Sequence, residues 1–289
     1  MRTGVARHGR ITARGVETRR PKLADDVDRK GGRGGPNTSL GASGRLRPIQ
    51  ASRLEQLQVR LSELPIPELG ACGATLGTLL DGIHSKSDVL RYNLQNGGVK
   101  WTALRDAPSL GDDPTVYTVF QTSLWVPLLL AAFYIVDGCL YLFVCEEEEA
   151  RFEAEQLSEV VVRLGALGVL LQISALLYEN YVQYSKIRLI LGSLTLANWA
   201  IFDKRLKTPY AKDKVNALKS LGLAIFAGAA APLIETVLID PLHLWYYPRP
   251  DVLGANGFPS WVPFCYMFYH PFLFSLARYL QDRKDAKSY

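Results

Sequence analysis

Long, almost uninterrupted apolar segments are the feature that most constrains what this chain can fold into. Four of them, residues 123–145, 160–178, 217–239 and 261–280, reach the length of about 20 residues that a helix needs to cross a bilayer. Backbone polar groups cannot stay unpaired in hydrocarbon, and the sequence shows no alternating barrel pattern, so these segments must be helical. The sequence therefore predicts an integral membrane protein of the all-α class.

Two further segments raise the predicted count to six. Residues 187–202 are shorter but almost wholly apolar, and Arg188 and Lys204 can extend their charges to the headgroups at either end. Residues 69–83 are less apolar, but Gly73 and Gly77 have the spacing of helices that approach one another closely. We expect a six-transmembrane-helix bundle, or five spans if this glycine-rich segment does not cross.

The N-terminal part of the chain has a different composition. Residues 1–48 hold ten Arg and two Lys against one Glu and three Asp, with few apolar residues, and are predicted to be disordered. Such a basic tail suits either a transit peptide or an arm near anionic lipid headgroups. A capping box, Ser52 to Glu55, and leucines three and four residues apart predict an amphipathic helix over 49–64. The six-helix membrane domain is then expected over 66–282.

Basic residues between the spans predict the orientation. Six spans place both termini on one side, and that side holds thirteen Lys and Arg against seven on the other. The positive-inside rule then puts both termini in the cytosol, or in the stroma of a plastid. Trp125, Trp199, Trp245 and Trp261 lie near the ends of spans and are expected at the headgroups.

Common catalytic and metal-binding patterns are absent from the sequence. It has no H-E-x-x-H, G-x-S-x-G, P-loop or Rossmann glycine motif, and its four cysteines stand singly. We therefore predict no catalytic residue, no metal site, no cofactor and no nucleic-acid partner, and we disfavour a lipid-modifying enzyme. The acidic run at 146–149 is interpreted as a solvated loop.

One carboxylate is predicted at membrane depth. Asp137 lies in the middle of the segment 123–145, where a charge costs at least about 2.5–3.5 kcal/mol. It should therefore face the interior of the bundle. There it can line a ligand cavity, or bond to a neighbouring helix through a residue such as Gln172 or Asn198.

Other ionisable residues occur near the ends of predicted spans. Asp81 and His84 are three residues apart, hence on one helix face, and Glu235 lies near the end of the fifth span. Hydration at the headgroups is the alternative for Asp81. Together with Asp137, Asp81 and His84 could serve a small-substrate membrane transporter, which the repeated Trp-Val-Pro at 125–127 and 261–263 favours slightly.

Several short motifs follow one another between residues 70 and 280. They are Ser123-Leu-Trp-Val-Pro127, Gly138-Cys-Leu-Tyr141, Leu194-Thr-Leu-Ala-Asn-Trp-Ala-Ile-Phe-Asp203, Leu221-Gly-Leu-Ala-Ile225, Ser260-Trp-Val-Pro-Phe-Cys265 and Ala277-Arg278. In this order they resemble the INSIG (insulin-induced gene) family, of which the chain looks like a distant branch. Animal members bind oxysterols among their helices, retain the escort protein SCAP in the endoplasmic reticulum and help deliver HMG-CoA reductase for degradation. Prokaryotic relatives look like diacylglycerol binders.

The resemblance implies a non-enzymatic regulator that binds a sterol or another lipid, such as diacylglycerol, and controls a SCAP-like or HMG-CoA-reductase-like membrane partner. It favours the endoplasmic reticulum membrane, with a plastid membrane as the alternative. Asp203 matches an aspartate that matters for partner regulation, and Trp199 matches a cavity-lining tryptophan. Because Asp203 lies at the end of a span beside Lys204 and Arg205, its replacement is expected to cost little stability.

The chain also departs from the family pattern. Lys186 stands at the position of the sterol-contacting glutamine, Asn198 replaces an apolar residue, and Ala200 replaces the second of two paired tryptophans. Asp81-Gly-Ile-His84 has no counterpart in the animal first helix. We therefore expect a lipid cavity with Trp199 and Asp137 in its lining and with Lys186 and Asn198 as further candidates, while the identity of the lipid stays open.

Overall fold

The computed structural model describes residues 61–105, 115–145 and 154–286, which all belong to the compact unit Ala51–Tyr289. The predicted basic tail and the acidic run at 146–149 lie outside these residues. Of the amphipathic helix predicted over 49–64, only the end is described, and residues 61–63 there are helical.

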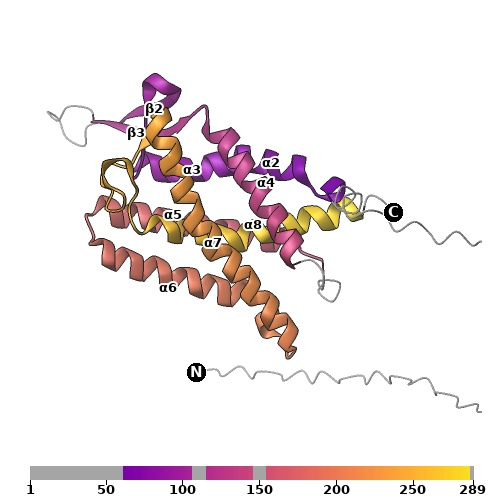
Figure 1. Cartoon of the computed structure of the whole chain (residues 1–289). Helices are drawn as coiled ribbons and strands as arrows, with labels where there is room; N and C mark the ends of the chain where they lie inside the picture. Colours follow the sequence, from indigo (N-terminus) through magenta and orange to yellow (C-terminus); the bar gives the residue numbers. More distant parts are fainter. Residues whose placement is uncertain (1–60, 106–114, 146–153, 287–289) are drawn as a thin grey trace, which may run out of the picture. The chain divides into compact units, whose positions relative to one another are not determined.

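Helices make up most of the described chain (Figure 1). In chain order they are α2 (Ile66–Cys72), a π-helical turn (Gly73–Gly77), α3 (Thr78–Lys86), α4 (Val126–Cys145), α5 (Leu157–Glu179), α6 (Tyr184–Phe202), α7 (Ala211–Leu242) and α8 (Val262–Asp285). The first three are continuous, so helical segments occupy the positions of all six predicted spans.

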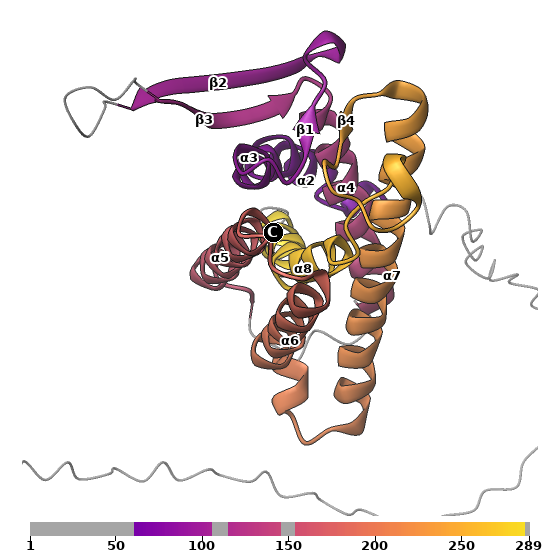
Figure 2. The ribbon, with the colours of Figure 1, turned by 90° about the vertical axis from the view of Figure 1, so that its left-hand side faces the viewer.

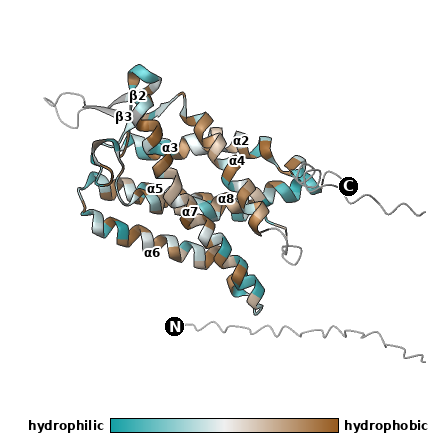
Figure 3. Cartoon of the chain, viewed as in Figure 1, coloured by the Kyte–Doolittle hydropathy of each residue, from teal (hydrophilic) through white to brown (hydrophobic). Residues whose placement is uncertain are grey.

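Three of these helices, α4, α5 and α7, are long and apolar enough to cross a membrane by length and composition. Figure 3 shows brown apolar residues along them, while hydrophilic teal gathers at the C-terminal end of α8. Among the described residues the other segments do not meet this criterion, because they are shorter or more polar. That they cross as well remains a prediction.

The connection between α3 and α4 contains strands, so the expectation of an all-α fold holds only for the bundle. β2 (Gly98–Arg105) and β3 (Thr115–Ser123) pair as an antiparallel hairpin, with an irregularity between Trp101 and Thr102. β1 (Arg91–Tyr92) pairs with β4 (Trp245–Tyr246), which follows α7. The β-branched and aromatic residues of β3 favour a strand. Figure 2 shows the hairpin beside α3, at one end of the bundle.

Glycines allow the first helical segment to lie close against α4. A Cβ atom added to Gly73 would collide with the backbone of Leu130 and Ala131. One added to Gly77 would lie 3.1 Å from the Cβ atom of Leu130. The close helix approach predicted from this spacing is therefore confirmed.

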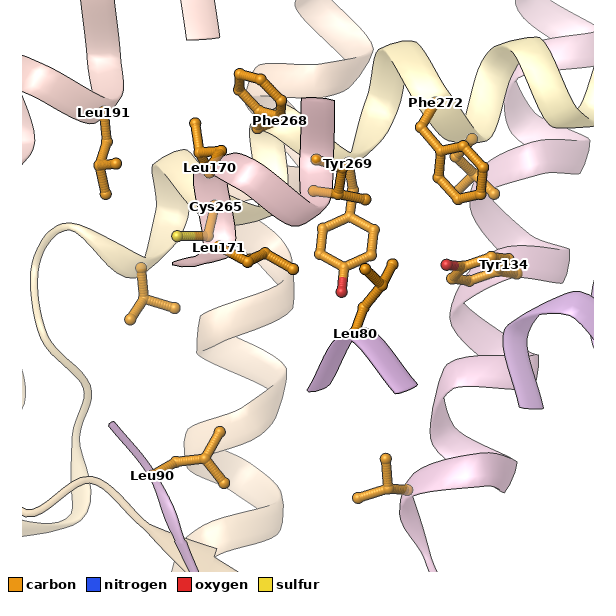
Figure 4. Packing of buried hydrophobic residues seen from close by; sticks show 14 of the residues in the cluster. Leu80, Leu90, Tyr134, Leu170, Leu171, Leu191, Cys265, Phe268, Tyr269 and Phe272 are labelled. Atoms are coloured by element: carbon orange, nitrogen blue, oxygen red, sulfur yellow. The ribbon is translucent and has the colours of Figure 1, made fainter. Parts of the chain in front are cut away.

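The hydrophobic core forms where the first segment, α4, α5 and α8 meet. Figure 4 shows Leu80 of α3 beside Tyr269 of α8, with Leu171 of α5 and Tyr134 of α4 near them. All four are at least nine-tenths buried. Aromatic residues of α8 thus provide the surface on which the other helices pack.

Two of the four tryptophans expected at the headgroups are buried within the protein. Trp261 is fully buried and packs edge-on against Tyr178, with ring centroids 5.8 Å apart. Trp245 is 6% exposed, whereas Trp125 is 50% exposed. The last turn of α7 and the segment that follows fold back over the bundle, so tryptophans near the predicted ends of spans become covered.

The beginning and the end of the described chain meet at one end of the bundle. The Lys284 ammonium donates to the carbonyl oxygens of Ser62 and Leu64, at 2.9 Å each. The backbone amide of Glu155, just before α5, donates to Asp282 of α8 at 2.9 Å. We call this the C-terminal end of the bundle. The two described ends therefore lie at the same end of the bundle.

Candidate functional site

A cavity of about 350 Å³ lies between α4 and α7, bordered also by α3, α8 and the β1–β4 pair. Most of its lining is apolar, for example Leu129 and Phe133 of α4 and Phe226 of α7. Ala230 and Ala231 of α7, which precede a proline in that helix, also line it, and their small side chains leave space. We call it the large cavity. Its volume lies within the ~300–1,000 Å³ typical of small-molecule sites.

Asp137 lines the large cavity and contacts a histidine of α8. The His270 Nε2 atom lies 3.1 Å from Oδ1 and 3.0 Å from Oδ2 of Asp137. Asp137 therefore borders a cavity, and its helix-to-helix partner is His270 and not Gln172 or Asn198. That a ligand binds there stays a prediction. Both side chains are almost fully buried, at 2% and 1% exposure.

The hydrogen bonds of His270 limit the protonation of the pair to two arrangements. Its Nδ1 atom lies 2.9 Å from the carbonyl oxygen of Tyr266, which can only accept, so Nδ1 carries a hydrogen. The contact with Asp137 then needs one more proton, on Nε2 or on the carboxyl group. In either arrangement the pair is neutral overall, which makes its burial tolerable.

One oxygen of Asp137 has no hydrogen-bond donor. The angles of a hydrogen bond to His270 are satisfied only at Oδ1, although Oδ2 is equally near, so Oδ2 has no donor among the described residues. A buried polar atom without a partner costs about 1–3 kcal/mol. A hydroxyl or amine on a ligand could supply that donor.

Two more carboxyl groups line the same cavity toward the β1–β4 pair. Asp81 accepts a hydrogen bond of 2.5 Å from the Tyr92 hydroxyl. Glu235 accepts one of 2.7 Å from Tyr247 and a second from Tyr266. Burial raises the pKa of the Tyr92 and Tyr247 hydroxyls well above their usual range, so both stay protonated and act as donors.

His84 does not share this environment with Asp81. Its Nε2 atom lies 2.7 Å from the Ser174 hydroxyl of α5, which itself donates to the carbonyl oxygen of Leu171. Since that hydroxyl has only one hydrogen, Nε2 of His84 must be the donor. The structure therefore groups Asp81, Asp137 and Glu235 around one cavity and leaves His84 in a separate contact between α3 and α5.

A second cavity of about 60 Å³, the small cavity, lies at the C-terminal end of the bundle between α5, α6, α7 and α8. Trp199, Asp203 and His270 are among its lining residues. Asp203 caps the 3-10 turn Lys204–Lys207 by accepting from the backbone amide of Arg205 at 3.0 Å. Its carboxylate also accepts from the Arg205 guanidinium at 2.9 and 2.8 Å and from the Ser220 hydroxyl at 3.0 Å.

The predicted lipid-binding residues are distributed over different places. Asp137 lines the large cavity, and Trp199 lines the small one. Asn198 is 6% exposed, and its Oδ1 atom has no donor among the described residues. Lys186 is exposed at the start of α6. The expected common lining of one cavity by Trp199 and Asp137 is therefore not what the structure shows.

Sequence reasoning overlooked several residues that form these sites. His270 lies within the predicted span 261–280, and Arg163 lies within the predicted span 160–178. Arg163 is 7% exposed and pairs with Glu155. A polar side chain inside an apolar span was the available signal, because such residues are costly in a membrane and usually face a polar partner.

The fold of this chain, but not its sequence, is similar to that of known proteins. No family model and no curated protein matches the sequence. The fold matches the crystal structure of MvINS, a mycobacterial Insig homolog from Mycobacterium vanbaalenii, with a TM-score of 0.51 over 76% of this chain and 95% of that one. The fold is Insig-like. The identity of 15% makes this a distant likeness, and it concerns the fold alone.

A second crystal structure, of a cross-linked MvINS trimer, agrees, with a TM-score of 0.51, 15% identity and coverage of 79% of this chain and 96% of that one. The Insig-like fold confirms the family resemblance inferred from the ordered motifs. Together with the apolar helices it supports a multi-pass protein embedded in a membrane.

Proposed function

We propose that this Insig-like protein is a non-enzymatic membrane regulator that holds a sterol or another lipid, such as diacylglycerol, in the large cavity. The observation that carries the proposal is a largely apolar cavity whose lining includes Asp137, a buried carboxylate with one oxygen, Oδ2, that has no donor among the described residues. An apolar body with one or two donating hydroxyls matches both features. The family resemblance adds control of a membrane protein partner, with the endoplasmic reticulum favoured over a plastid membrane.

The partner surface is proposed at the C-terminal end of the bundle, around Asp203. The Asp203 carboxylate is itself buried, with its side chain 7% exposed, and it is fully engaged by Arg205 and Ser220. We infer that it acts by holding the 3-10 turn Lys204–Lys207 in shape, so that the turn presents its exposed side chains to the partner. In this role the Asp203 carboxylate does not contact the partner directly.

The lipid site can be tested with photo-crosslinkable diacylglycerol and sterol analogues on the purified full chain. Asp137→Leu should lower crosslinking about threefold or more, because it removes the oxygen that accepts from the ligand, whereas Asp137→Asn keeps an oxygen acceptor and should change crosslinking less. Ala230→Phe fills the large cavity and should abolish crosslinking. Its control is Ala229→Phe, whose exposed position on the same helix does not line the cavity. Trp199→Phe should have little effect.

Two outcomes of these experiments would contradict the proposed lipid site. Equal crosslinking of the Ala229→Phe and Ala230→Phe variants would mean that the lipid does not bind in the large cavity. Loss of thermal stability in Asp137→Leu with crosslinking intact would leave Asp137 with a purely structural role.

A transporter for a small substrate remains the second candidate. The specific observation in its favour is that Asp81, Asp137 and Glu235 line one cavity. His84, which this hypothesis also used, is engaged with Ser174 instead. Uptake assays in proteoliposomes address this candidate: accumulation of a small cation that depends on both Asp81 and Glu235 would favour transport over lipid sensing.

A further inference from the structure

The large cavity is bordered by residues that also lie on the outer surface of the bundle. Val136 of α4 and Phe226 and Ile234 of α7 line it, and each of them is between 58% and 66% exposed. Leu140, one turn further along α4, also lines the cavity and is exposed. A residue that borders a cavity and is more than half exposed lies at its rim. The large cavity therefore opens through the side of the bundle between α4 and α7, and we call this the lateral opening.

The lateral opening faces the hydrocarbon of the membrane. α4 and α7 are two of the three described helices that are long and apolar enough to cross it, and the rim residues lie inside their apolar stretches. Figure 2 shows α7 at the edge of the bundle, on the side away from α5. Phe226 and Ile234 are eight residues apart, about 12 Å along a helix, so the opening fits within the ~30 Å of the hydrocarbon core. Lipid acyl chains, and not water, therefore surround the opening.

The lining of the large cavity changes in polarity along its length. Asp81, Tyr92 and Glu235 line the end that the β1–β4 pair borders, where the Tyr92 hydroxyl donates to Asp81 at 2.5 Å. Because α7 runs toward β4, Phe226 lies farther from this pair than Glu235 does, and the lining around it is apolar. Asp137, in the middle of α4, lies between the two ends. The cavity is thus polar at the β1–β4 end and apolar toward Phe226.

The β1–β4 pair covers the polar end of the large cavity. Besides the pairing of the two strands, the backbone amide of Asn93 donates to the carbonyl oxygen of Leu244 at 3.0 Å. Tyr92 and Trp245, one from each strand, are buried and pack edge-on with ring centroids 6.2 Å apart. A ligand that arrives from water must separate these strands, whereas passage through the lateral opening needs movement of side chains alone.

We propose that the large cavity takes up its ligand sideways from the bilayer, through the lateral opening, and holds it with the polar end toward the β1–β4 pair. This inference rests on the proposed function, since it concerns the lipid proposed for the same cavity. It defines the ligand as a membrane lipid whose small, uncharged head carries hydroxyl groups. Hydroxyls donate to the carboxyl groups of Asp81 and Glu235, while the hydrocarbon lies toward Phe226. A phosphate head would bring negative charge next to these carboxyl groups and is expected not to bind.

The orientation can be tested with two photoreactive diacylglycerols that differ only in the position of the diazirine, beside the glycerol or at the end of one acyl chain. The full chain is labelled in phosphatidylcholine nanodiscs, and the labelled peptides are identified by mass spectrometry. The glycerol probe should label the peptides of β1 and β4, and the chain-end probe should label α4 and α7 near Leu140 and Phe226. Reversed labelling, or the same pattern with both probes, overturns the proposed orientation.

The route can be tested with variants at the rim of the lateral opening, by illumination after increasing times of exchange. Val136→Trp narrows the opening and should slow both loading and release of the glycerol probe about tenfold, which corresponds to a barrier higher by about 1.4 kcal/mol. Phe226→Ala widens the opening and should speed up both. The matched controls, Val169→Trp on α5 and Leu233→Ala on α7, change exposed residues outside the cavity lining and should exchange the probe at the wild-type rate. Wild-type rates in both rim variants overturn the lateral route.

Competition tests the class of ligand and separates two kinds of failure. Unlabelled diacylglycerol should displace the probes, whereas phosphatidic acid with the same acyl chains, which differs only in its phosphate, should not. Equal displacement by phosphatidic acid overturns the proposed class. Absence of any displaceable labelling in the wild-type chain overturns the lipid function itself. Displaceable labelling with wild-type exchange rates in the rim variants overturns the lateral route alone.

Discussion

Asp137 and His270 form a contact that separates the two cavities of this protein. Asp137 lines the large cavity, His270 lines the small one, and the His270 Nε2 atom lies 3.1 Å from Oδ1 of Asp137. The pair joins α4 to α8 in the middle of the bundle. A ligand in the large cavity would therefore lie against Asp137, whose partner His270 lines the small cavity together with Asp203.

The proton shared by this pair predicts how substitutions of Asp137 will behave. Asp137→Asn keeps a donor for Nε2 of neutral His270, so the melting temperature in detergent should change little. Asp137→Ala leaves Nε2 buried and unpaired and should cost about 1–3 kcal/mol. Thermal unfolding of both variants checks the difference. Equal destabilisation by both would mean that the charge of the aspartate, and not its hydrogen bond, holds the helices together.

Replacement of Asp203 should be costly, in contrast to what its position at the end of a span suggested. The side chains of Asp203 and Arg205 are 7% and 8% exposed, so Asp203→Ala leaves a buried guanidinium without its carboxylate. Breaking such a pair typically costs about 3–5 kcal/mol. The double variant Asp203→Asn with Arg205→Met should recover much of the stability. If Asp203→Ala unfolds at the wild-type temperature, the ion pair is not a structural element.

The close approach of the π-helical turn Gly73–Gly77 to α4 predicts a sharp contrast between two glycines. Gly73→Ala forces its Cβ into the backbone of Leu130 and should cost about 1–3 kcal/mol. Gly165→Ala in α5 meets nothing within 4 Å and should leave stability unchanged or raise it by up to about 1 kcal/mol through helix propensity. Thermal unfolding of the two variants provides the comparison. A harmless Gly73→Ala would mean that the two helices can separate at little expense.

The number of crossings can be measured directly. Tags at both ends of the chain should be accessible from the same side of sealed vesicles, the cytosolic or stromal one, because α2 begins where α8 ends. Protease protection is the readout, with a tag in the hairpin loop at 106–114 as the control for the opposite side. Protection of one terminus alone would mean an odd number of crossings, and α2–α3 would be the first candidate to lie outside the membrane.

The sequence by itself determined the positions of the helices, the close approach at Gly73 and Gly77, and the need of Asp137 for a polar neighbour inside the bundle. These features depend on local information, because hydrophobic run length, residue size and the cost of a buried charge can be read along one segment. The ordered motifs added the Insig-like fold. The β-branched and aromatic residues of β3 also carry a local strand signal.

Only the tertiary structure decided which residues share a site. His270 is 133 positions from Asp137 in the chain, and their contact depends on how α4 and α8 are rotated about their axes. The same rotations place Trp199 and Asp137 in different cavities and bury the Asp203 carboxylate against Arg205. Helix periodicity defines the faces of one helix but not the partner of each face. The partner is set by the simultaneous packing of all side chains, which no single segment of sequence contains.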